Sequence, residues 1–325
     1  MKAIRQFEYG GVDKLILDSV PNPVPGPGQV RIRVQAAGVQ LLDVQLRSGQ
    51  GPARARAPLP VTPGREVAGR IDAVGNEVDE SWTGTYVVAD LGIAGGGYAE
   101  LALADVGALH RLSHDLDPAE AVAALGTGRT VQAILELAQL TRRDSLLVTG
   151  ASGGIGTMLL KAARSVGANV VALASGEEKR RIAASFGAPA LDSNSATWRQ
   201  QALDALPDGG ATVVADGVGG ELGTQAMSLL GVRGRLVMFG TASGSPISLS
   251  ADTVFASGIT VSAAVGARLL ARPGGLRDLE EKSLRALEDR SLVPVIGHRF
   301  SLTQAREAHR TMEERRSHGK VILLP

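Results

Sequence analysis

The stretch "LLVTGASGGIG", Leu146–Gly156, decides the fold of this chain. An apolar run enters a cluster of glycines, and the residues that follow, "TMLLKAARSVGA", carry apolar side chains at helical spacing. This order predicts a buried strand, a tight turn and a helix, the arrangement that holds a dinucleotide pyrophosphate at a helix N-terminus. Gly153 would let the backbone approach the phosphates, and Gly156 would let the helix pack closely on the strand. Ala151 stands at the first glycine position of the usual motif, and the alternative is a strand–helix turn without a ligand.

Strands and helices alternate over the residues that follow this loop. Strand-like segments recur at "NVVALAS", "ATVVADGVGG", "GRLVMFG" and "ITVSAAVG", and "EEKRRIAASFGA" reads as a helix between the first two. Such alternation predicts a parallel, doubly wound sheet. We expect "ITVSAAVG" to close this sheet at one edge.

The regions on either side of this alternating segment differ from it in residue pattern. Residues 1 to about 118 are rich in predicted strands, and "QVRIRVQAAGV" alternates apolar and polar residues with the period of a half-buried strand. "RSGQGPARARAPLP" reads as a surface loop, in which we expect Arg54 and Arg56 to be solvated. From about residue 270 the chain becomes helical and charged before the apolar segment "GKVILLP". At 325 residues, the chain is long enough for two domains.

Composition narrows the function. The net charge is +1, from 34 basic and 33 acidic residues, so nothing in the charge balance indicates a nucleic-acid partner. The sequence has no cysteine, which excludes disulfides, thiolate metal sites and a cysteine nucleophile. No apolar run approaches the ~18 residues of a membrane helix, and the N-terminus lacks a signal-peptide core. We expect a cytoplasmic protein without a membrane partner.

The second strand of the predicted sheet suggests which cofactor binds. NAD-binding folds usually end this strand with an acidic residue that bonds the ribose 2′-hydroxyl. Here the strand ends at Ala174-Ser175, and Lys179 and two arginines follow. A 2′-phosphate needs donors and positive charge, so we predict NADPH with Ser175 and Lys179 as contacts. The alternative is that "EEKRR" is only the solvated start of a helix, with its acids near the positive end.

Together these motifs resemble the medium-chain dehydrogenase/reductase superfamily, in its zinc-free quinone oxidoreductase (zeta-crystallin-like) branch. The resemblance covers nearly the whole chain, through blocks such as "VPNPVPGPGQVRIRVQAAGV", "TPGREVAGRIDAVG", "VTGASGGIG" and "AREAHRTMEERRSHGKVILL" in order. It implies an α/β fold, with a GroES-like β domain over residues 1–118 and 270–325. A Rossmann domain with a doubly wound parallel sheet would occupy residues 119–269. It also implies a cofactor cleft and a homodimer that pairs the "ITVSAAVG" edges.

The resemblance carries cofactor contacts over by position. These are Thr130, Gly153, Gly154, Ile155, Ser175, Lys179, Ser193, Phe239, Gly240, Gly319 and Lys320. Ser193 stands where the family often has a tyrosine near the adenine. Substrate-pocket candidates are Gln40, Asp43 and Gln45, where the family often has Asn in place of Gln40 and Tyr in place of Gln45. Asp43 could equally be a structural acid that bonds its own loop.

A catalytic zinc is not expected. Zinc dehydrogenases need about three protein ligands, and their "Gly-His-Glu" histidine is replaced here by Arg65, which stays protonated. The neighbouring Glu66 would have a structural or pocket role, pairing with an arginine. His110 and His114 have i, i+4 spacing but fall in a turn-rich connector. We therefore predict no metal site.

The sequence predicts an NADPH-dependent reductase that transfers hydride directly to a small-molecule quinone or similar conjugated carbonyl. Without zinc, such an enzyme works mainly by proximity and orientation. Two alternatives stay open. One is an enone or enoyl-thioester reductase of the same fold, and the other is an NADPH-binding redox sensor or structural protein with little turnover.

Overall fold

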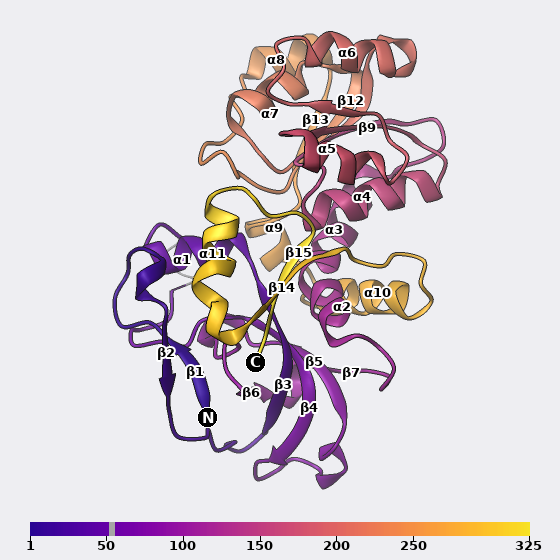
Figure 1. Ribbon diagram of the computed structural model, residues 1–325. Coiled ribbons are helices and arrows are strands. Elements are labelled where there is room, and N and C mark those ends of the chain that lie inside the picture. Colours follow the sequence, from indigo (N-terminus) through magenta and orange to yellow (C-terminus); the bar gives the residue numbers. More distant parts are fainter. Residues whose placement is uncertain (52–55) are drawn as a thin grey trace. The chain divides into compact units, whose positions relative to one another are not determined.

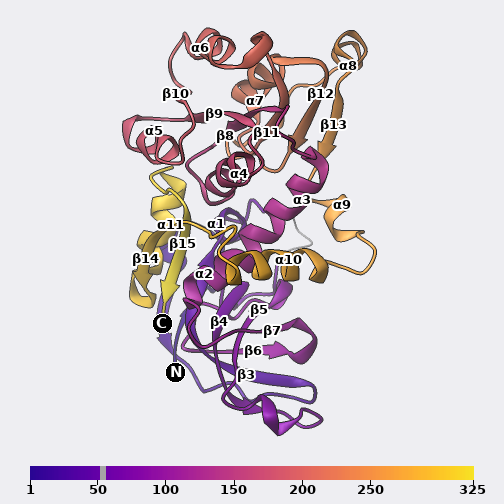
Figure 2. The same cartoon turned by 90° about the vertical axis from the view of Figure 1, so that its right-hand side faces the viewer.

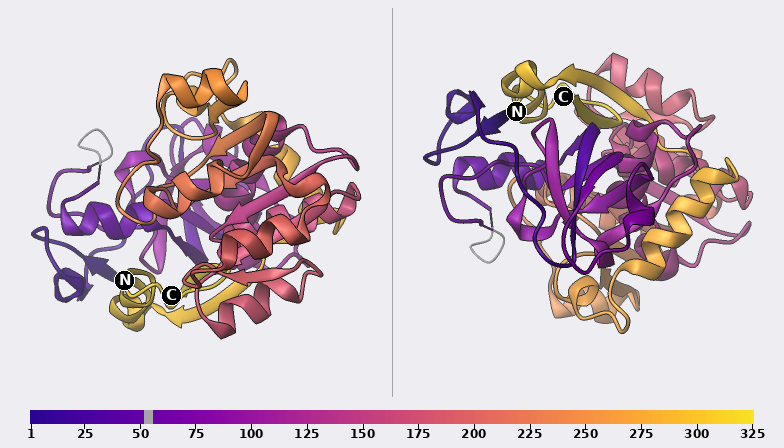
Figure 3. Two further views of the ribbon diagram at one scale, coloured as in Figure 1. Left: turned by 90° about the horizontal axis from the view of Figure 1, so that it is seen from above. Right: turned by 90° about the horizontal axis from the view of Figure 1, so that it is seen from below.

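The computed structural model describes residues 1–51 and 56–325, which form two compact units (Figure 1). The first unit comprises Met1–Gly126 and Leu287–Pro325, and the second comprises Thr127–Ala286. Both chain ends therefore belong to the first unit (Figure 3). No helix among the described residues is long and apolar enough to cross a membrane. Arg54, predicted to be solvated, lies outside the described residues.

A mostly antiparallel sheet forms the first unit. Its strands lie in the order β14-β15-β3-β4-β5-β7, and β6 also pairs with β3. Only β14 and β15 are parallel neighbours among the described strands of this sheet. The strands are β3 (Gln29–Val39), β4 (Glu66–Val74), β5 (Tyr86–Asp90), β6 (Leu101–Asp105), β7 (Leu109–Arg111), β14 (Ile296–Ser301) and β15 (Lys320–Leu324), and a separate hairpin pairs β1 (Lys2–Arg5) with β2 (Ile16–Ser19).

The predicted alternation in β3 is confirmed. Val30, Ile32 and Val34 are all buried in the core of the first unit. Three helices complete this unit, namely α1 (Leu41–Ser48), α2 (Pro118–Ala123) and α11 (Ala305–Glu313). Helix α2 packs on β3, β4 and β5, whereas α11 packs on β14 and β15.

The second unit contains a six-stranded sheet in the order β10-β9-β8-β11-β12-β13, with every neighbouring pair parallel. The chain runs outward from β8 to β10 and then returns to β11, so the predicted doubly wound sheet is confirmed. Its strands are β8 (Ser145–Thr149), β9 (Asn169–Ala174), β10 (Ala190–Asp192), β11 (Ala211–Asp216), β12 (Leu230–Met238) and β13 (Thr260–Ala263). As predicted, β13 from "ITVSAAVG" is the edge strand.

Helices cover both faces of this sheet. Helices α4 and α5 lie on one face, and α6 and α7 lie on the other (Figure 2). Trp198 of α6 and Met227 of α7 join Leu147 and Leu173 in one buried apolar cluster. The helices are α3 (Arg129–Ala138), α4 (Gly154–Ser165), α5 (Glu177–Ala184), α6 (Trp198–Ala205), α7 (Gly220–Met227), α8 (Ala251–Ser257), α9 (Ala267–Leu270) and α10 (Arg277–Glu288).

The chain passes from one unit to the other after Gly126 and after Ala286, whereas the predicted boundaries were 118/119 and 269/270. The change of texture near Pro118 marks a helix start, because Asp117 caps α2 and Pro118 is its first residue. That helix packs on the first unit's sheet, so the first unit continues to Gly126. Near the other boundary, Arg129 Nη1 of α3 donates to Glu280 Oε1 of α10 over 2.6 Å. This ion pair ties α10 to the second unit, which extends to Ala286.

The glycine turn after β8 brings helix α4 against the strand end. A Cβ atom at Gly156 would lie 2.5 Å from Gly150 O and 2.6 Å from Ala151 Cα, both of them backbone atoms. Only glycine therefore fits at this contact without a backbone shift. Gly153 differs, because the nearest atom to a Cβ there is Gly150 O at 3.4 Å.

We expect Gly156→Ala to lower the free energy of unfolding of the second unit by about 1–3 kcal/mol, the usual cost of overpacking. Gly153→Ala is the matched control in the same turn, since its φ of −73° suits alanine. It should change the free energy by less than about 0.5 kcal/mol. Urea unfolding followed by the fluorescence of the buried Trp198 measures both. Equal effects of the two substitutions would contradict this account of Gly156.

Candidate active site

The turn between β8 and α4 has the geometry of a phosphate site. Gly150 adopts a φ of 61°, Ala151 and Ser152 are buried, and Gly153 is the N-cap of α4. The first N–H groups of a helix lack intrahelical partners and lie at the positive end of its dipole. Because Gly153 has no side chain and its Cβ position is uncrowded, an anion can approach this helix end closely. The turn therefore fits a dinucleotide pyrophosphate.

An internal hydrogen-bond network braces the turn. Thr149 Oγ1, at the end of β8, donates to Asp216 Oδ1 at the end of β11 over 2.5 Å. Gly217 N donates to Thr149 Oγ1 over 3.1 Å, and Gly219 N donates to Asp216 Oδ2 over 2.9 Å. Sequence reasoning missed this brace. Its one sequence signal was an aspartate at the end of the otherwise apolar strand in "ATVVAD".

The predicted nicotinamide-side contacts also follow strand ends of the second unit. Phe239 follows β12, and its N–H donates to Asp216 O over 2.8 Å. A Cβ at Gly240 would lie 2.7 Å from Gly217 O, so this segment packs closely on the end of β11. Gly153 and Phe239–Gly240 thus lie beyond the carboxyl ends of β8 and β12, where doubly wound sheets bind ligands. Thr130 lies in the first turn of α3, and Gly154 and Ile155 open α4.

The predicted 2′-phosphate contacts gather at the end of β9. Ser175 follows the strand and is exposed, and Lys179 lies in the first turn of α5, four residues further along the chain. Ser193 N donates to Ala174 O over 3.1 Å, so the structure brings Ser193 beside Ser175. It also brings Asp192 opposite Ala174 in the β9–β10 register, an acid that sequence reasoning missed. The Asp192 carboxylate accepts a hydrogen bond from Asn194 N in its own turn.

Glu66 forms the centre of a buried polar cluster in the first unit. Lys320 Nζ donates to Glu66 Oε2 over 2.9 Å, and the two side chains are 6% and 1% exposed. Gln40 Nε2 donates to Glu66 Oε1. The prediction that Glu66 pairs with an arginine is therefore wrong, because the cation that pairs with it is Lys320. Gly319, with a φ of 53°, precedes β15, and the Lys320 side chain is committed to Glu66.

Asp43 joins a second buried cluster. Its Oδ2 accepts from Gln40 N over 2.8 Å, closing a capping box at the start of α1, and from the Tyr98 hydroxyl over 3.2 Å. Tyr98 also lies 3.2 Å from His309 Nε2. Burial raises the pKa of Asp43 to about 6, and the nearby Glu66 carboxylate adds to the rise. Burial and the Arg47 cation lower the pKa of His309 to about 3.

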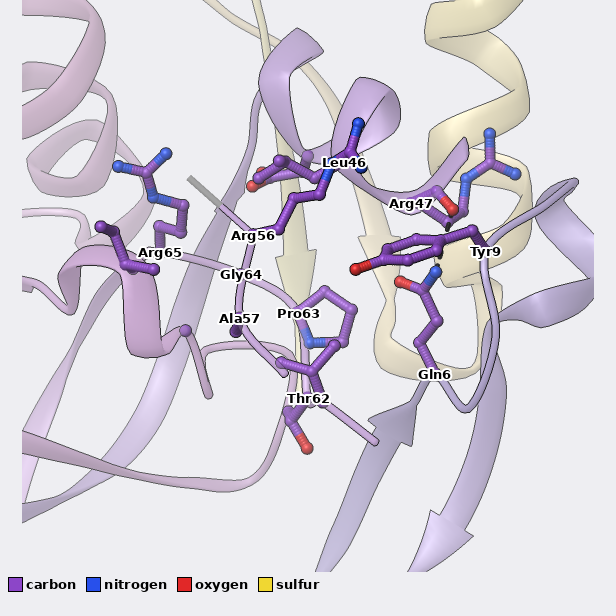
Figure 4. A pocket seen from close by; sticks show the side chains of 14 residues that line it. Gln6, Tyr9, Leu46, Arg47, Arg56, Ala57, Thr62, Pro63, Gly64 and Arg65 are labelled. Atoms are coloured by element: carbon purple, nitrogen blue, oxygen red, sulfur yellow. Dashed lines mark hydrogen bonds between the residues drawn. The ribbon is translucent and has the colours of Figure 1, made fainter. Parts of the chain in front are cut away.

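A small pocket opens beside Asp43 in the first unit (Figure 4). Its volume is about 50 Å³, and its lining includes Gln6, Tyr9, Asp43, Leu46, Arg47, Arg56 and Arg65. Of the predicted pocket residues, Asp43 lines it. Gln40 turns its amide to Glu66 instead, and Gln45 is not among the described lining residues.

Two arginines of this pocket bear on the sequence expectations. Arg56 is half-buried, and its Nε and Nη2 donate to Gly51 O over 3.1 and 2.8 Å. The prediction that Arg56 is a solvated side chain is therefore wrong. Arg65 donates from Nε to Gly92 O over 3.1 Å. Within the described residues, no three His, Cys, Asp or Glu side chains gather closely enough to hold a metal ion.

Known proteins match this chain along its full length. Residues 26–114 match the family described as alcohol dehydrogenase GroES-like domain, and residues 154–280 match zinc-binding dehydrogenase. The quinone oxidoreductase of Mus musculus is 32% identical, over 100% of this chain and 98% of the mouse protein. A mycobacterial protein solved in complex with NADPH superposes on this chain with a TM-score of 0.87 and is 30% identical in sequence. A solved NAD-dependent alcohol dehydrogenase superposes with a TM-score of 0.88 and is 28% identical. Each covers 100% of both chains.

The phosphate turn at the switch point of a doubly wound sheet, together with a GroES-like unit, defines a nicotinamide-dependent oxidoreductase. The chain belongs to the medium-chain dehydrogenase/reductase superfamily, in its quinone oxidoreductase branch. It is an enzyme that binds NAD(P)H and acts on a small molecule.

The raised pKa of Asp43 gives a testable pH dependence. Folding favours its protonated form, so the folded state binds more protons than the unfolded state between the ordinary pKa of 3.8 and about 6. The contribution of Asp43 to the free energy of unfolding therefore falls as pH rises through this window. Asp43→Asn cannot titrate, and its amide oxygen can accept the same two hydrogen bonds.

We expect the free energy of unfolding of Asp43→Asn, relative to the wild type, to increase by roughly 1–3 kcal/mol between pH 4 and pH 7. Urea titrations at intervals of about half a pH unit measure this difference, and other titrating groups cancel in it. Parallel curves for the two proteins would rule out a raised pKa at Asp43.

Proposed function

We propose that this enzyme uses NADPH to reduce a quinone, or a similar conjugated carbonyl compound, without zinc. The observation that carries the proposal is the substitution of the zinc-ligand histidine. Arg65 cannot coordinate a metal, and its Nε is already engaged by Gly92 O. The absence of cysteine from the sequence removes a further common ligand. The names of the quinone oxidoreductase relatives agree with this reading.

The chain's own residues would bind and orient the reactants. The turn at Gly153 and the N-terminus of α4 would hold the pyrophosphate, and Phe239 and Gly240 would contact the nicotinamide ribose. When bound, NADPH supplies a hydride. One proton must accompany it to convert a quinone to the hydroquinone, and solvent or Asp43, the acid at the pocket, would provide that proton. Proximity and orientation would then supply most of the rate enhancement.

NADPH rather than NADH is proposed from the residues at the end of β9. Ser175 offers a hydroxyl donor, Lys179 adds charge, and Ser193 lies beside them. Arg180 follows Lys179 in α5 and adds a second positive charge to the start of this helix. The Asp192 carboxylate already caps its own turn at Asn194 N. The solved relatives include both an NADPH complex and an NAD-dependent enzyme, so the preference rests on these residues.

A homodimer through β13 is part of the proposal. This strand ends the sheet order, and its other edge has no partner strand among the described residues. An unpaired edge is a template for pairing with another chain, and pairing two copies satisfies both edges.

Lys179→Ala should weaken NADPH binding by about tenfold and change NADH binding by less than about twofold, because only the 2′-phosphate loses a charged donor. Arg181→Ala is the control, since this exposed residue lies on the same helix. Fluorescence titration of the wild type and both variants with each cofactor gives the six dissociation constants needed. Tighter binding of NADH than NADPH by the wild type would overturn the cofactor assignment.

The chelator-dialysed protein, shown by elemental analysis to be metal-free, should oxidise NADPH in the presence of quinones. Its rate should stay within about twofold of the rate with added zinc, because no Lewis acid takes part. The assay is loss of NADPH absorbance against quinones, enones and enoyl thioesters. Turnover of enones or thioesters alone would favour the enone reductase. NADPH binding without turnover would favour a sensor or structural protein, and activity restored only by zinc would refute the metal-free reading.

A further inference from the structure

Two pocket arginines of the first unit carry charge that no acid neutralises. Among the described residues, neither Arg56 nor Arg65 forms an ion pair: their hydrogen bonds go to backbone carbonyl groups, and the Arg56 guanidinium also lies 5.6 Å from the centroid of the Tyr9 ring. A carbonyl accepts a hydrogen bond but does not cancel a positive charge. The third pocket arginine, Arg47, is different, because its Nη2 pairs with Glu313.

Arg65 is arranged to receive an anion. Its Nε is anchored on Gly92 O, and its two terminal nitrogens have no partner among the described residues. These two nitrogens form the end of the guanidinium fork, which binds both oxygens of a carboxylate. In Figure 4 the Arg65 side chain extends to the left of the Thr62–Gly64 segment and the Arg56 side chain extends to the right, toward Leu46.

The described lining of the pocket holds more arginine than acid, because Arg47, Arg56 and Arg65 line it beside one acidic residue, Asp43. Glu66 is paired with Lys320, and Glu313 with Arg47. Asp43 also lines the pocket, but its Oδ2 is occupied by Gln40 N and the Tyr98 hydroxyl, and it forms no ion pair with Arg65. Even an ionised Asp43 would offset only one of the two unpaired arginines.

The size of the pocket limits what it can take. A volume of about 50 Å³ holds a few water-sized groups, which suits a carboxylate head rather than a fused ring system. We propose that Arg65 binds a carboxylate on the acceptor, with Arg56 adding positive charge elsewhere in the pocket lining, so that the preferred substrates are conjugated carbonyl compounds bearing an acidic group. This inference rests on the proposed function, because it names the class of acceptor. Arg65 acts in binding rather than in the chemical step, so its loss should raise KM more than it lowers kcat.

The test compares 1,4-naphthoquinone with its 2-sulfonate, which presents anionic oxygens to the same fork. Arg65→Gln should lower kcat/KM for the sulfonate by about tenfold or more, mainly through KM, and change the neutral quinone by less than about threefold. Arg65→Lys should be intermediate, because it keeps the charge without the fork. Comparing variants cancels the different reduction potentials of the two quinones.

Arg70→Gln is a closely matched control. Arg70 lies on β4, the strand that Arg65 immediately precedes. Its Nε also donates to a glycine carbonyl, Gly84 O, over 2.9 Å, and its side chain is exposed. This substitution removes the same net charge outside the pocket. Equal effects of Arg65→Gln and Arg70→Gln on the sulfonate would overturn the inference. NADPH affinity and circular dichroism check that each variant is folded.

A binding measurement separates this inference from the proposed function. Calorimetry should show that 2-naphthoate binds the wild-type protein at least about tenfold more tightly than 2-naphthamide, and that Arg65→Gln removes the difference. This result without quinone turnover would refute the proposed function and support the anion subsite. Quinone turnover with equal affinities for acid and amide would leave the function standing and refute the subsite.

Discussion

The buried ion pair between Glu66 and Lys320 is the constraint on which the first unit depends. It joins the start of β4 to the start of β15, residues separated by most of the chain. Both strands flank β3, so the pair fixes the register of the C-terminal strand in a sheet built mainly from the N-terminal part. Removing one partner of such a pair generally costs about 3–5 kcal/mol, because the other charge stays buried. A Cβ at Gly126 would lie 1.5 Å from Glu66 Oε1, so the backbone around the carboxylate must also remain bare.

This constraint shapes the pocket beside it. Because Glu66 is satisfied by Lys320 and Gln40, it offers nothing to the adjacent Arg65. In a zinc enzyme, the histidine at the Arg65 position would bring a ligand to a metal, whereas here the position contributes a cation. The difference lies in one side chain, since the fold around it is shared.

Sequence reasoning succeeded where the signal was local. The glycine turn and the strand–helix alternation each follow from periodicity or glycine spacing within about twenty residues. The predicted domain boundary near Pro118 differs from the observed one at Gly126, because a helix start and a domain boundary have the same signature in sequence. Asp192 was missed because its position opposite Ala174 depends on strand order, which periodicity does not contain. The role of Lys320 was missed for the same reason, since its partner Glu66 is distant in sequence.

The cluster of Asp43, Tyr98 and His309 shows how far local patterns fall short. Tyr98 has one proton, and it donates that proton to Asp43. His309 Nε2 must then carry hydrogen and donate to the tyrosine oxygen, which leaves Nδ1 as a bare acceptor. His309 Nδ1 is buried and has no hydrogen-bond partner among the described residues. The positive charge of the nearby Arg47 opposes protonation of the imidazole ring. Burial disfavours charge at both ends of the chain of hydrogen bonds, raising the pKa of the acid and lowering that of the base. The cluster therefore orders α1 and α11 against Tyr98 by hydrogen bonds among a neutral tyrosine, a neutral histidine and an acid that titrates near pH 6.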